Sequence, residues 1–144
     1  MFPVLSDADL YKFTGGKPPD DMETLENWFT ALESRLSPDG SEQWLTWVVQ
    51  LTQSDTPIGY VQATVRGPSA EISWLIGTRW QANGYASDAV TSLLSLLEGY
   101  ELDEVIAHIH PKHSASHHIA RRHSLIPSGG QHKGEEIWTR QMRT

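Results

Sequence analysis

Cysteine is absent from this chain of 144 residues. Its absence excludes disulfides, thiolate metal sites and a cysteine nucleophile, and it fits a cytoplasmic protein. Long apolar runs are also missing: none approaches the roughly 20 residues that a membrane-spanning helix needs. The first residues, 1–5, have neither the basic start nor the apolar stretch of a secretory signal. We therefore expect a cytoplasmic protein that does not enter a membrane.

Positive charge is scarce, with 11 Lys and Arg against 18 Asp and Glu and a formal net charge of -7. Such a protein repels a phosphate backbone, so nucleic-acid binding is not expected. Cationic partners such as amines are compatible with this charge, although acidity also serves solubility alone. The length and a hydrophobic content of 38% predict a single globular domain over residues 1–144.

Turn-forming residues divide the first forty residues into two expected helices. Ser6 can cap a short helix that ends near Phe13, and the Gly- and Pro-rich segment 14–19 then interrupts the chain. A second helix precedes the turn at 37–40. Its apolar residues fall on one stripe at helical spacing: Leu25, Trp28, Phe29, Leu32 and Leu36.

Three short strands are predicted next, at residues 44–51, 58–65 and 70–76. The links between them are turns of a few residues, which favours an antiparallel meander. The hydrophobic period then changes to that of a helix over 85–97, which ends near Gly99.

A strand at 105–109 follows this helix, so it should pair in parallel with the strand before the helix. The rest of the chain predicts a short helix at 114–123, a loop at 127–133 and a last strand at 136–142, with a short partner strand near Leu125. The expected class is α/β (α+β), with a mixed, mostly antiparallel sheet and flanking helices.

The turn at residues 79–88 lies between the strand that ends near Ile76 and the strongly periodic helix that starts near Tyr85. Gly84 and Ala86 are small, so the backbone there can approach a ligand closely. Amides at a helix N-terminus carry partial positive charge and bind phosphates, and a pyrophosphate fits this turn. The alternative is a glycine-containing loop that only connects strand and helix.

The segment 81–86, Gln-Ala-Asn-Gly-Tyr-Ala, resembles the Q/R-x-x-G-x-G/A signature of the GNAT acetyltransferases. Residues 80–89 are similar to the W-x-x-x-G-Y-A-x-E-A form of the ribosomal-protein alanine N-acetyltransferase branch, with Asp88 in place of Glu. The segment 107–116 resembles a second pattern of that branch, h-P-x-N-x-x-S, in which His113 takes the Asn position and Ser116 matches the Ser. Ser124 stands where the family has Gly, and must adopt a conformation that Gly adopts more cheaply. The resemblance covers about residues 22–142.

The resemblance implies the GNAT fold with a splayed pair of parallel strands, and acetyl-CoA as co-substrate. A primary amine would attack the thioester directly in a ternary complex. Main-chain amides at the end of the third predicted strand would hold the pantetheine arm and polarise the carbonyl. The cofactor-binding residues implied are Leu75, Ile76, Gln81, Ala82, Asn83, Gly84, Tyr85, Ala86, Ser87 and His113.

Glu71 is the first candidate for the base, because residues 70–74 match the A-E-I-x-W of the branch. A solvent-facing glutamate at a strand end is the equal alternative. Ser116 is a candidate proton donor to the thiolate. The alternative is that Ser116 lies inside the helix and its hydroxyl bonds only to the backbone. Many GNAT enzymes use a Tyr for this step, but that position is Ala120 here. His110 is a second candidate base.

Six histidines fall within sixteen residues: His108, His110, His113, His117, His118 and His123. His113 and His117 are spaced i, i+4, which can place two imidazoles on one helix face. No carboxylate or HExxH spacing accompanies them, so we expect cleft-lining or solvated histidines and no metal. The tryptophans are expected in the core and in cleft walls.

GNAT domains begin with an edge strand, and no strand pattern precedes Ser6. The strand at 44–51 would then have a bare edge, which we expect the N-terminal segment or a second subunit of a homodimer to cover. The predicted function is N-acetylation of a small-molecule amine or a peptide N-terminus. Two alternatives are a weakly active or inactive module that binds a CoA ester or a protein partner, and a small metal-binding protein.

Overall fold

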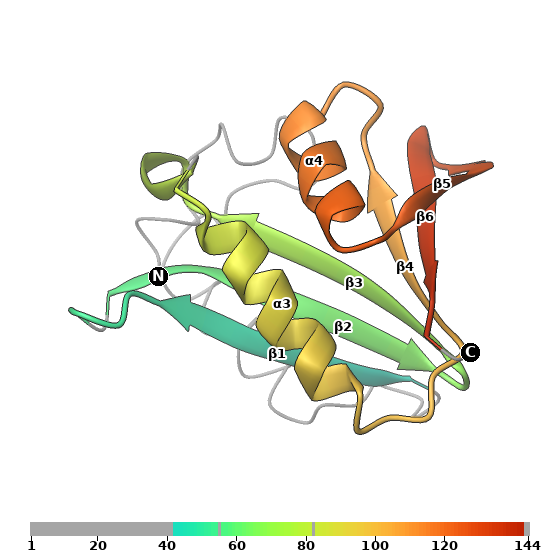
Figure 1. The fold of residues 1–144 in the computed structure, drawn as a ribbon, viewed down its shortest axis with the longest axis horizontal. Helices are drawn as coiled ribbons and strands as arrows, with labels where there is room; N and C mark the ends of the chain where they lie inside the picture. Colours follow the sequence, from blue (N-terminus) through green and yellow to red (C-terminus); the bar gives the residue numbers. More distant parts are fainter. Residues whose placement is uncertain (1–41, 55, 82, 143–144) are drawn as a thin grey trace.

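The computed structural model describes residues 42–54, 56–81 and 83–142, and the two helices expected before residue 41 lie outside them. The described chain forms a six-stranded sheet with two α-helices on one of its faces (Figure 1). In chain order the elements are β1 (Gln43–Gln50), β2 (Pro57–Arg66), β3 (Ser69–Ile76), a 3₁₀ turn (Thr78–Trp80), α3 (Tyr85–Leu97), β4 (Glu104–Ile109), α4 (Ser114–Arg122), β5 (Ile126–His132) and β6 (Glu135–Gln141).

The strands lie in the order β1-β2-β3-β4-β6-β5, and every neighbouring pair is antiparallel except β3 and β4. The parallel pair arises because α3 carries the chain across one face of the sheet between these two strands. This confirms the predicted mixed, mostly antiparallel sheet with flanking helices.

The parallel pair separates soon after it begins. Its register extends only from Ser69↔Glu104 to Glu71↔Ile106. Beyond that point β3 stays paired with β2 as far as Ile76, while β4 stays paired with β6 as far as Ile109. The sheet therefore splits, and Figure 1 shows β3 and β4 diverging from a shared base toward α4.

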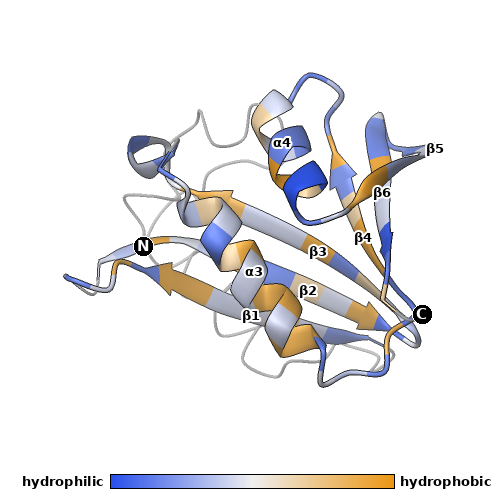
Figure 2. Cartoon of the chain, viewed as in Figure 1, coloured by the Kyte–Doolittle hydropathy of each residue, from blue (hydrophilic) through white to orange (hydrophobic). Residues whose placement is uncertain are grey.

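One face of the sheet forms the core with α3. Successive strand residues point to opposite faces, and the apolar members of β2 and β3 point toward α3, where Ala63, Ile72, Val90 and Leu93 are almost fully buried. Figure 2 shows hydrophobic segments in β1, β2 and β3 beneath α3. The opposite face carries the polar members of the same strands.

The bounds of the predicted elements are close to those observed: α3 spans the 13 residues expected, and β1 to β4 start or end within one residue of the prediction. The loop predicted at 127–133 is wrong, because this segment forms β5, whose residues are all exposed. β5 pairs with β6 at Ile126↔Thr139 and again at Gln131↔Glu136, with an irregularity between. Main-chain hydrogen bonds to β6 hold β5 in place, so the sequence of β5 has no alternation of apolar and polar residues that would predict a strand.

α4 ends as the sequence predicts. Ser124 has a φ of 69°, in the left-handed region that favours glycine. The Leu125 amide donates to the Ala120 carbonyl at 2.9 Å, which closes the helix end. The serine therefore adopts a conformation that costs it more than it would cost glycine.

β1 and β5 are the two outer strands of the described sheet. The segment that we expect to cover β1 lies outside the described residues. Among the described residues, no helix is long and apolar enough to span a bilayer.

Candidate functional site

The turn between β3 and α3 is held by two polar side chains. Gln81 Nε2 donates to the Ile76 carbonyl at 2.9 Å. Asn83 Nδ2 donates to the carbonyls of Trp80 and Gln81, at 3.2 and 3.0 Å. These side chains satisfy carbonyls of the turn and fix its path into α3, and Ala82 between them lies outside the described residues.

Helix α3 begins with amides that have no partner within the helix. Gly84 is its N-cap, with a φ of 82° and no side chain to cap the helix. The hydrogen-bond ladder begins where the Asp88 amide donates to the Gly84 carbonyl at 3.0 Å. The amides of Tyr85, Ala86 and Ser87 therefore precede the ladder, at the positive end of the helix dipole. This arrangement suits an anion.

A cavity of about 330 Å³ opens beside these amides, between α3 and α4. We call it the α3–α4 cavity. It extends from the first turn of α3 to Arg122 at the end of α4, so a helix N-terminus and an arginine both line it, from opposite walls. Its described lining residues are Trp74, Ile76, Trp80, Gln81, Gly84, Tyr85, Ala86, Ser87, His113, Ala115, Ser116, His118, Ile119 and Arg122.

The end of β3 offers main-chain groups to this cavity. The Gly77 amide donates to the Ile58 carbonyl of β2 at 2.7 Å. Because hydrogen-bonding direction alternates along an antiparallel pair, the Leu75 amide also faces β2. The amides of Trp74 and Ile76 face the side that β4 has left. Trp74 and Ile76 line the cavity, whereas Leu75 is buried and does not line it.

A second cavity of about 270 Å³ lies where β3 and β4 separate. We call it the β3–β4 cavity. Its polar strand residues lie on the face opposite to α3, because they alternate with core residues. Its described lining residues are Gln62, Thr64, Glu71, Ile72, Ser73, Trp74, Ala107, His108, Ile109, His110, His113, Ser116 and Glu135. Trp74, His113 and Ser116 line both cavities, so the two are neighbours at the end of β3 and the start of α4.

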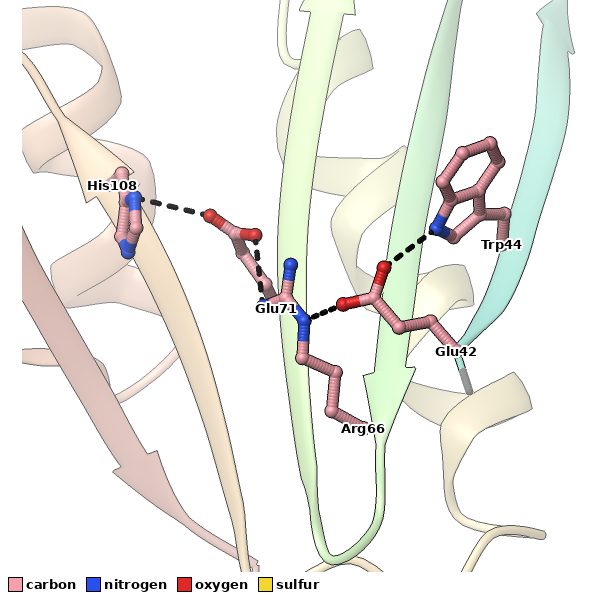
Figure 3. Close-up of polar contacts among 5 residues, drawn as sticks. All are labelled: Glu42, Trp44, Arg66, Glu71 and His108. Carbon is pink, nitrogen blue, oxygen red and sulfur yellow. Dashed lines mark hydrogen bonds and ion pairs between the residues drawn. The ribbon is translucent and has the colours of Figure 1, made fainter. Parts of the chain in front are cut away.

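Glu71 occupies the base of the split and belongs to a row of polar contacts across β4, β3 and β2 (Figure 3). One carboxylate oxygen lies 3.1 Å from His108 Nδ1, and the other lies 3.6 Å from an Arg66 guanidinium nitrogen. Arg66 also pairs with Glu42, which in turn accepts a hydrogen bond from Trp44 at 3.1 Å. The hydrogen bond to Glu42 is the main cause that raises the pKa of Arg66.

Two residues of α4 lie where the cavities meet. His113 is the N-cap of α4, and burial lowers its pKa, with His117 and His110 lowering it further. Ser116 is 7% exposed. Ala120, one turn further along α4, is fully buried and has no titratable group. Both candidate residues of α4 are thus adjacent to the split, as is Glu71.

The remaining histidines of this region have separate contacts. The His117 ring stacks on Trp138 with centroids 5.2 Å apart, and its Nε2 lies 3.0 Å from Glu136 Oε1. The angle there does not suit a hydrogen bond, since Nε2 is buried without one, so we treat the contact as electrostatic. No group of three His, Asp or Glu among the described residues is placed to hold a metal ion.

Helices α3 and α4 are joined by one polar contact near the turn. Ser87 Oγ and His123 Nε2 are 3.1 Å apart. Burial lowers the pKa of His123, the bond to Ser87 raises it, and the nearby Arg122 and Arg140 lower it. The contact links the first turn of α3 to the end of α4, which are opposite walls of the α3–α4 cavity.

Two charged lining residues, Arg122 and Glu135, were assigned no role from the sequence, and His108 was expected only to line a cleft or to be solvated. Arg122 lies in the last turn of a helix, where basic residues are common for reasons of the helix dipole alone. Glu135 begins β6 and faces His132 of β5 across a short turn. His108 of β4 reaches Glu71 of β3, and α3 separates these two strands in the sequence. Local patterns do not show that Arg122 and Glu135 line a cavity or that His108 contacts Glu71.

Comparison with known families gives one match to a family model, described as an acetyltransferase (GNAT) domain, over residues 1–124. No curated protein matches the sequence. Solved structures match over nearly the whole chain at low identity, which shows a shared fold.

A spermidine N-acetyltransferase from Vibrio cholerae, solved with CoA and spermine, is 15% identical, with a TM-score of 0.74 over 97% of this chain and 86% of the other. An aminoglycoside acetyltransferase solved with coenzyme A is 15% identical, with a TM-score of 0.76 over 98% and 87%. A candidate ribosomal-protein-serine acetyltransferase from Vibrio cholerae is 20% identical, with a TM-score of 0.71 over 85% and 76%.

Proposed function

Because the chain belongs to the acetyltransferase (GNAT) domain family, we propose that it transfers an acetyl group from acetyl-CoA to a primary amine. The observation that supports this most is that the two cavities lie side by side and share lining residues. One cavity begins at the first amides of α3, the other is lined by Glu71, and Trp74, His113 and Ser116 line both. A nucleotide thioester and an amine could thus approach each other from opposite faces of the sheet.

The diphosphate of CoA would bind the amides of Tyr85, Ala86 and Ser87, with Gly84 allowing close approach. Arg122 would add a positive charge from the other wall. Gln81 and Asn83 would act by holding the turn. Two of the solved structures that share this fold contain CoA, which supports the choice of cofactor.

The pantetheine arm would follow the freed edge of β3 toward the split. The outward amides of Trp74 and Ile76 are placed to bond to it, and the Leu75 amide, which faces β2, is not. His113 would contact the arm from α4. An amide that polarises the thioester carbonyl stabilises the negative charge that develops on its oxygen during attack.

The acceptor would occupy the β3–β4 cavity. Its ammonium loses a proton with the help of Glu71, and the neutral amine attacks the thioester carbon. A C–N bond forms, the C–S bond breaks, and CoA leaves as a thiolate that takes up a proton. Ser116, which lines both cavities, would be the donor of this proton and would regain one from the new amide nitrogen.

A small cationic amine fits this cavity best. Glu71 and Glu135 both line it, and carboxylates favour positive ligands. The related structures include enzymes named for spermidine and for aminoglycosides, which agrees with an amine acceptor. A peptide N-terminus is a second acceptor to test, because one related structure is named for a ribosomal-protein-serine acetyltransferase and the sequence resembles the ribosomal-protein branch.

Calorimetry with acetyl-CoA and a thiol-release assay test the proposal. The acceptor panel contains spermidine, an aminoglycoside, ethylamine and a peptide with an N-terminal alanine. We expect acetyl-CoA to bind and at least one amine to release free thiol. Binding without thiol release from any acceptor would indicate a module that only binds a CoA ester. No binding of acetyl-CoA would contradict both the acetyltransferase and the binding module.

Gly84→Asp and Gly67→Asp form a matched pair for the binding site. Both glycines have positive φ, at 82° and 56°, and a Cβ at either would contact nothing within 4 Å. Aspartate tolerates this conformation comparatively well. Only Gly84 lies at the α3 amides, so its variant alone places a negative charge beside the diphosphate. We expect the Kd for CoA to rise at least about 10-fold for Gly84→Asp, equivalent to about 1.4 kcal/mol, and to stay unchanged for Gly67→Asp.

A further inference from the structure

The carboxylate of Glu71 is engaged on both oxygens. Oε1 lies 3.1 Å from His108 Nδ1 and Oε2 lies 3.6 Å from Arg66. Figure 3 shows the carboxylate between the imidazole and the guanidinium. A carboxylate with both oxygens committed to cationic or N–H partners is a poor direct acceptor for a substrate proton. It is well suited to orient the group beside it.

Arg66 is itself held in place. It is the last residue of β2 and pairs with Glu42, the residue before β1, on the side of Glu71 away from His108. This arrangement fixes the guanidinium, which in turn fixes the Glu71 rotamer. Glu42, Arg66 and Glu71 are thus each bonded to the next residue of the row. His108, at its end, uses one ring nitrogen for Glu71 and has a second.

That atom is His108 Nε2. When Nδ1–H donates to Glu71, the neutral ring carries its lone pair on Nε2. Among the described residues, no hydrogen bond to Nε2 is formed. The side chain is 24% exposed and lines the β3–β4 cavity together with Ser73 and Trp74. An acceptor nitrogen is thus presented to the cavity in which the proposed amine binds.

We propose that His108 Nε2 takes the proton from the acceptor ammonium and that Glu71 is the positioning residue that orients the ring. This inference rests on the proposed acetyl transfer. The N–H bond of the ammonium breaks, and its electron pair becomes the nucleophile that forms the new C–N bond. The imidazolium, stabilised by Glu71, then gives the proton to solvent after CoA has left.

Other titratable groups face His108 and enter the design of the test. His132 of β5 lies with its ring centroid 5.3 Å away, and Glu71 faces it from β3. His110, His113 and Glu135 line the same cavity. A pH dependence of the rate therefore needs assignment by variants at more than one position.

The first experiment measures kcat/KM against pH with acetyl-CoA and the amine of the panel above that releases thiol fastest. For His108→Gln we expect a loss of about 100-fold near neutral pH. The loss should shrink as pH rises, because more of the free amine is then neutral without a base. For Glu71→Gln we expect a smaller loss, about 10-fold, because the imidazole remains but the carboxylate no longer orients it.

His132→Gln is the matched control, since it removes a neighbouring imidazole that, within the described part of the chain, forms no ion pair with Glu71. It should keep the acidic limb of the unaltered protein. Binding of CoA, measured by calorimetry, should be the same in all three variants. The proposal is overturned if His108→Gln keeps the acidic limb, if His132→Gln removes it, or if Glu71→Gln is the more harmful of the two substitutions.

The second experiment needs no substrate. Nitrogen-15 NMR of the imidazoles in the intact protein reports which ring nitrogen carries the proton. We expect the Nδ1–H tautomer for His108, and its loss in Glu71→Gln. The Nε2–H tautomer in the unaltered protein would refute the assignment. If the Nδ1–H tautomer is found but no amine releases thiol, the proposed acetyl transfer fails and the proton-transfer role fails with it, while the pair remains as a structural contact.

Discussion

Gly59 permits the close approach of β2 to the end of β3, and Gly59→Ala should damage the fold severely. A Cβ at this position would lie 2.0 Å from the Leu75 carbonyl oxygen and 2.9 Å from Ile76 Cα. Both are main-chain atoms, so no rotamer change relieves the clash. The strand segment that it would displace is the one whose outward amides face the split in the sheet.

The magnitude follows from two costs. Forcing one extra carbon into a packed site costs about 1–3 kcal/mol, and disturbing the adjacent strand pairing costs about 1 kcal/mol per hydrogen bond. We expect a loss of about 2–4 kcal/mol in the free energy of unfolding, measured by urea denaturation. For a domain of this size, this corresponds to a fall in Tm of roughly 10 °C.

Gly99→Ala is the matched control, because the nearest atom to its Cβ is the Leu96 carbonyl oxygen at an ordinary 3.7 Å. This variant should have a stability within about 0.5 kcal/mol of the unaltered protein, or slightly higher. If Gly59→Ala is as stable as Gly99→Ala, the close strand approach at the end of β3 is refuted.

Three further predictions concern α4, pH and the core. Ser124→Gly should raise the free energy of unfolding by up to about 1 kcal/mol, because it relieves a left-handed φ; an unchanged urea midpoint would contradict this. Burial lowers the pKa of His113 and His123 below the ordinary 6.5. The unfolded chain therefore binds more protons, and the free energy of unfolding should fall as pH drops below 6.5 through the folded pKa values. Thermal melts at pH 7.5 and 5.5 should show a smaller difference in Tm when both histidines are replaced by Gln. Leu93→Ala removes a fully buried side chain and should cost about 2–5 kcal/mol, whereas Leu96→Ala, at a position 49% exposed, should cost little in the same urea titration.

Helix α3 and its preceding turn could be predicted because their signals are local. A 3.6-residue period defines the helix, and glycines mark its start and its end. β5 could not be predicted in this way. All of its residues are exposed, so no alternation of buried and exposed side chains distinguishes it from a loop, and only its pairing with β6 defines it as a strand.

The site residues also differ in whether a local sequence pattern predicts them. The amides at Tyr85 to Ser87 follow from a short sequence pattern, as does the position of Ser116. The partner of Glu71 does not, since His108 reaches it only through the parallel register that pairs Glu71 with Ile106. The choice between Leu75 and Trp74 as a main-chain donor depends on which amides of β3 face β2. The sequence alone does not show which amides these are.

The central claim is that the first amides of α3 hold the diphosphate of CoA. An NMR titration of the labelled protein with CoA, and in parallel with pantetheine, tests it most directly. We predict that CoA shifts the amide resonances of Tyr85, Ala86 and Ser87 and that pantetheine, which lacks the diphosphate, leaves them in place. Binding of CoA that leaves these three resonances unmoved, or equal shifts with pantetheine, would contradict the claim.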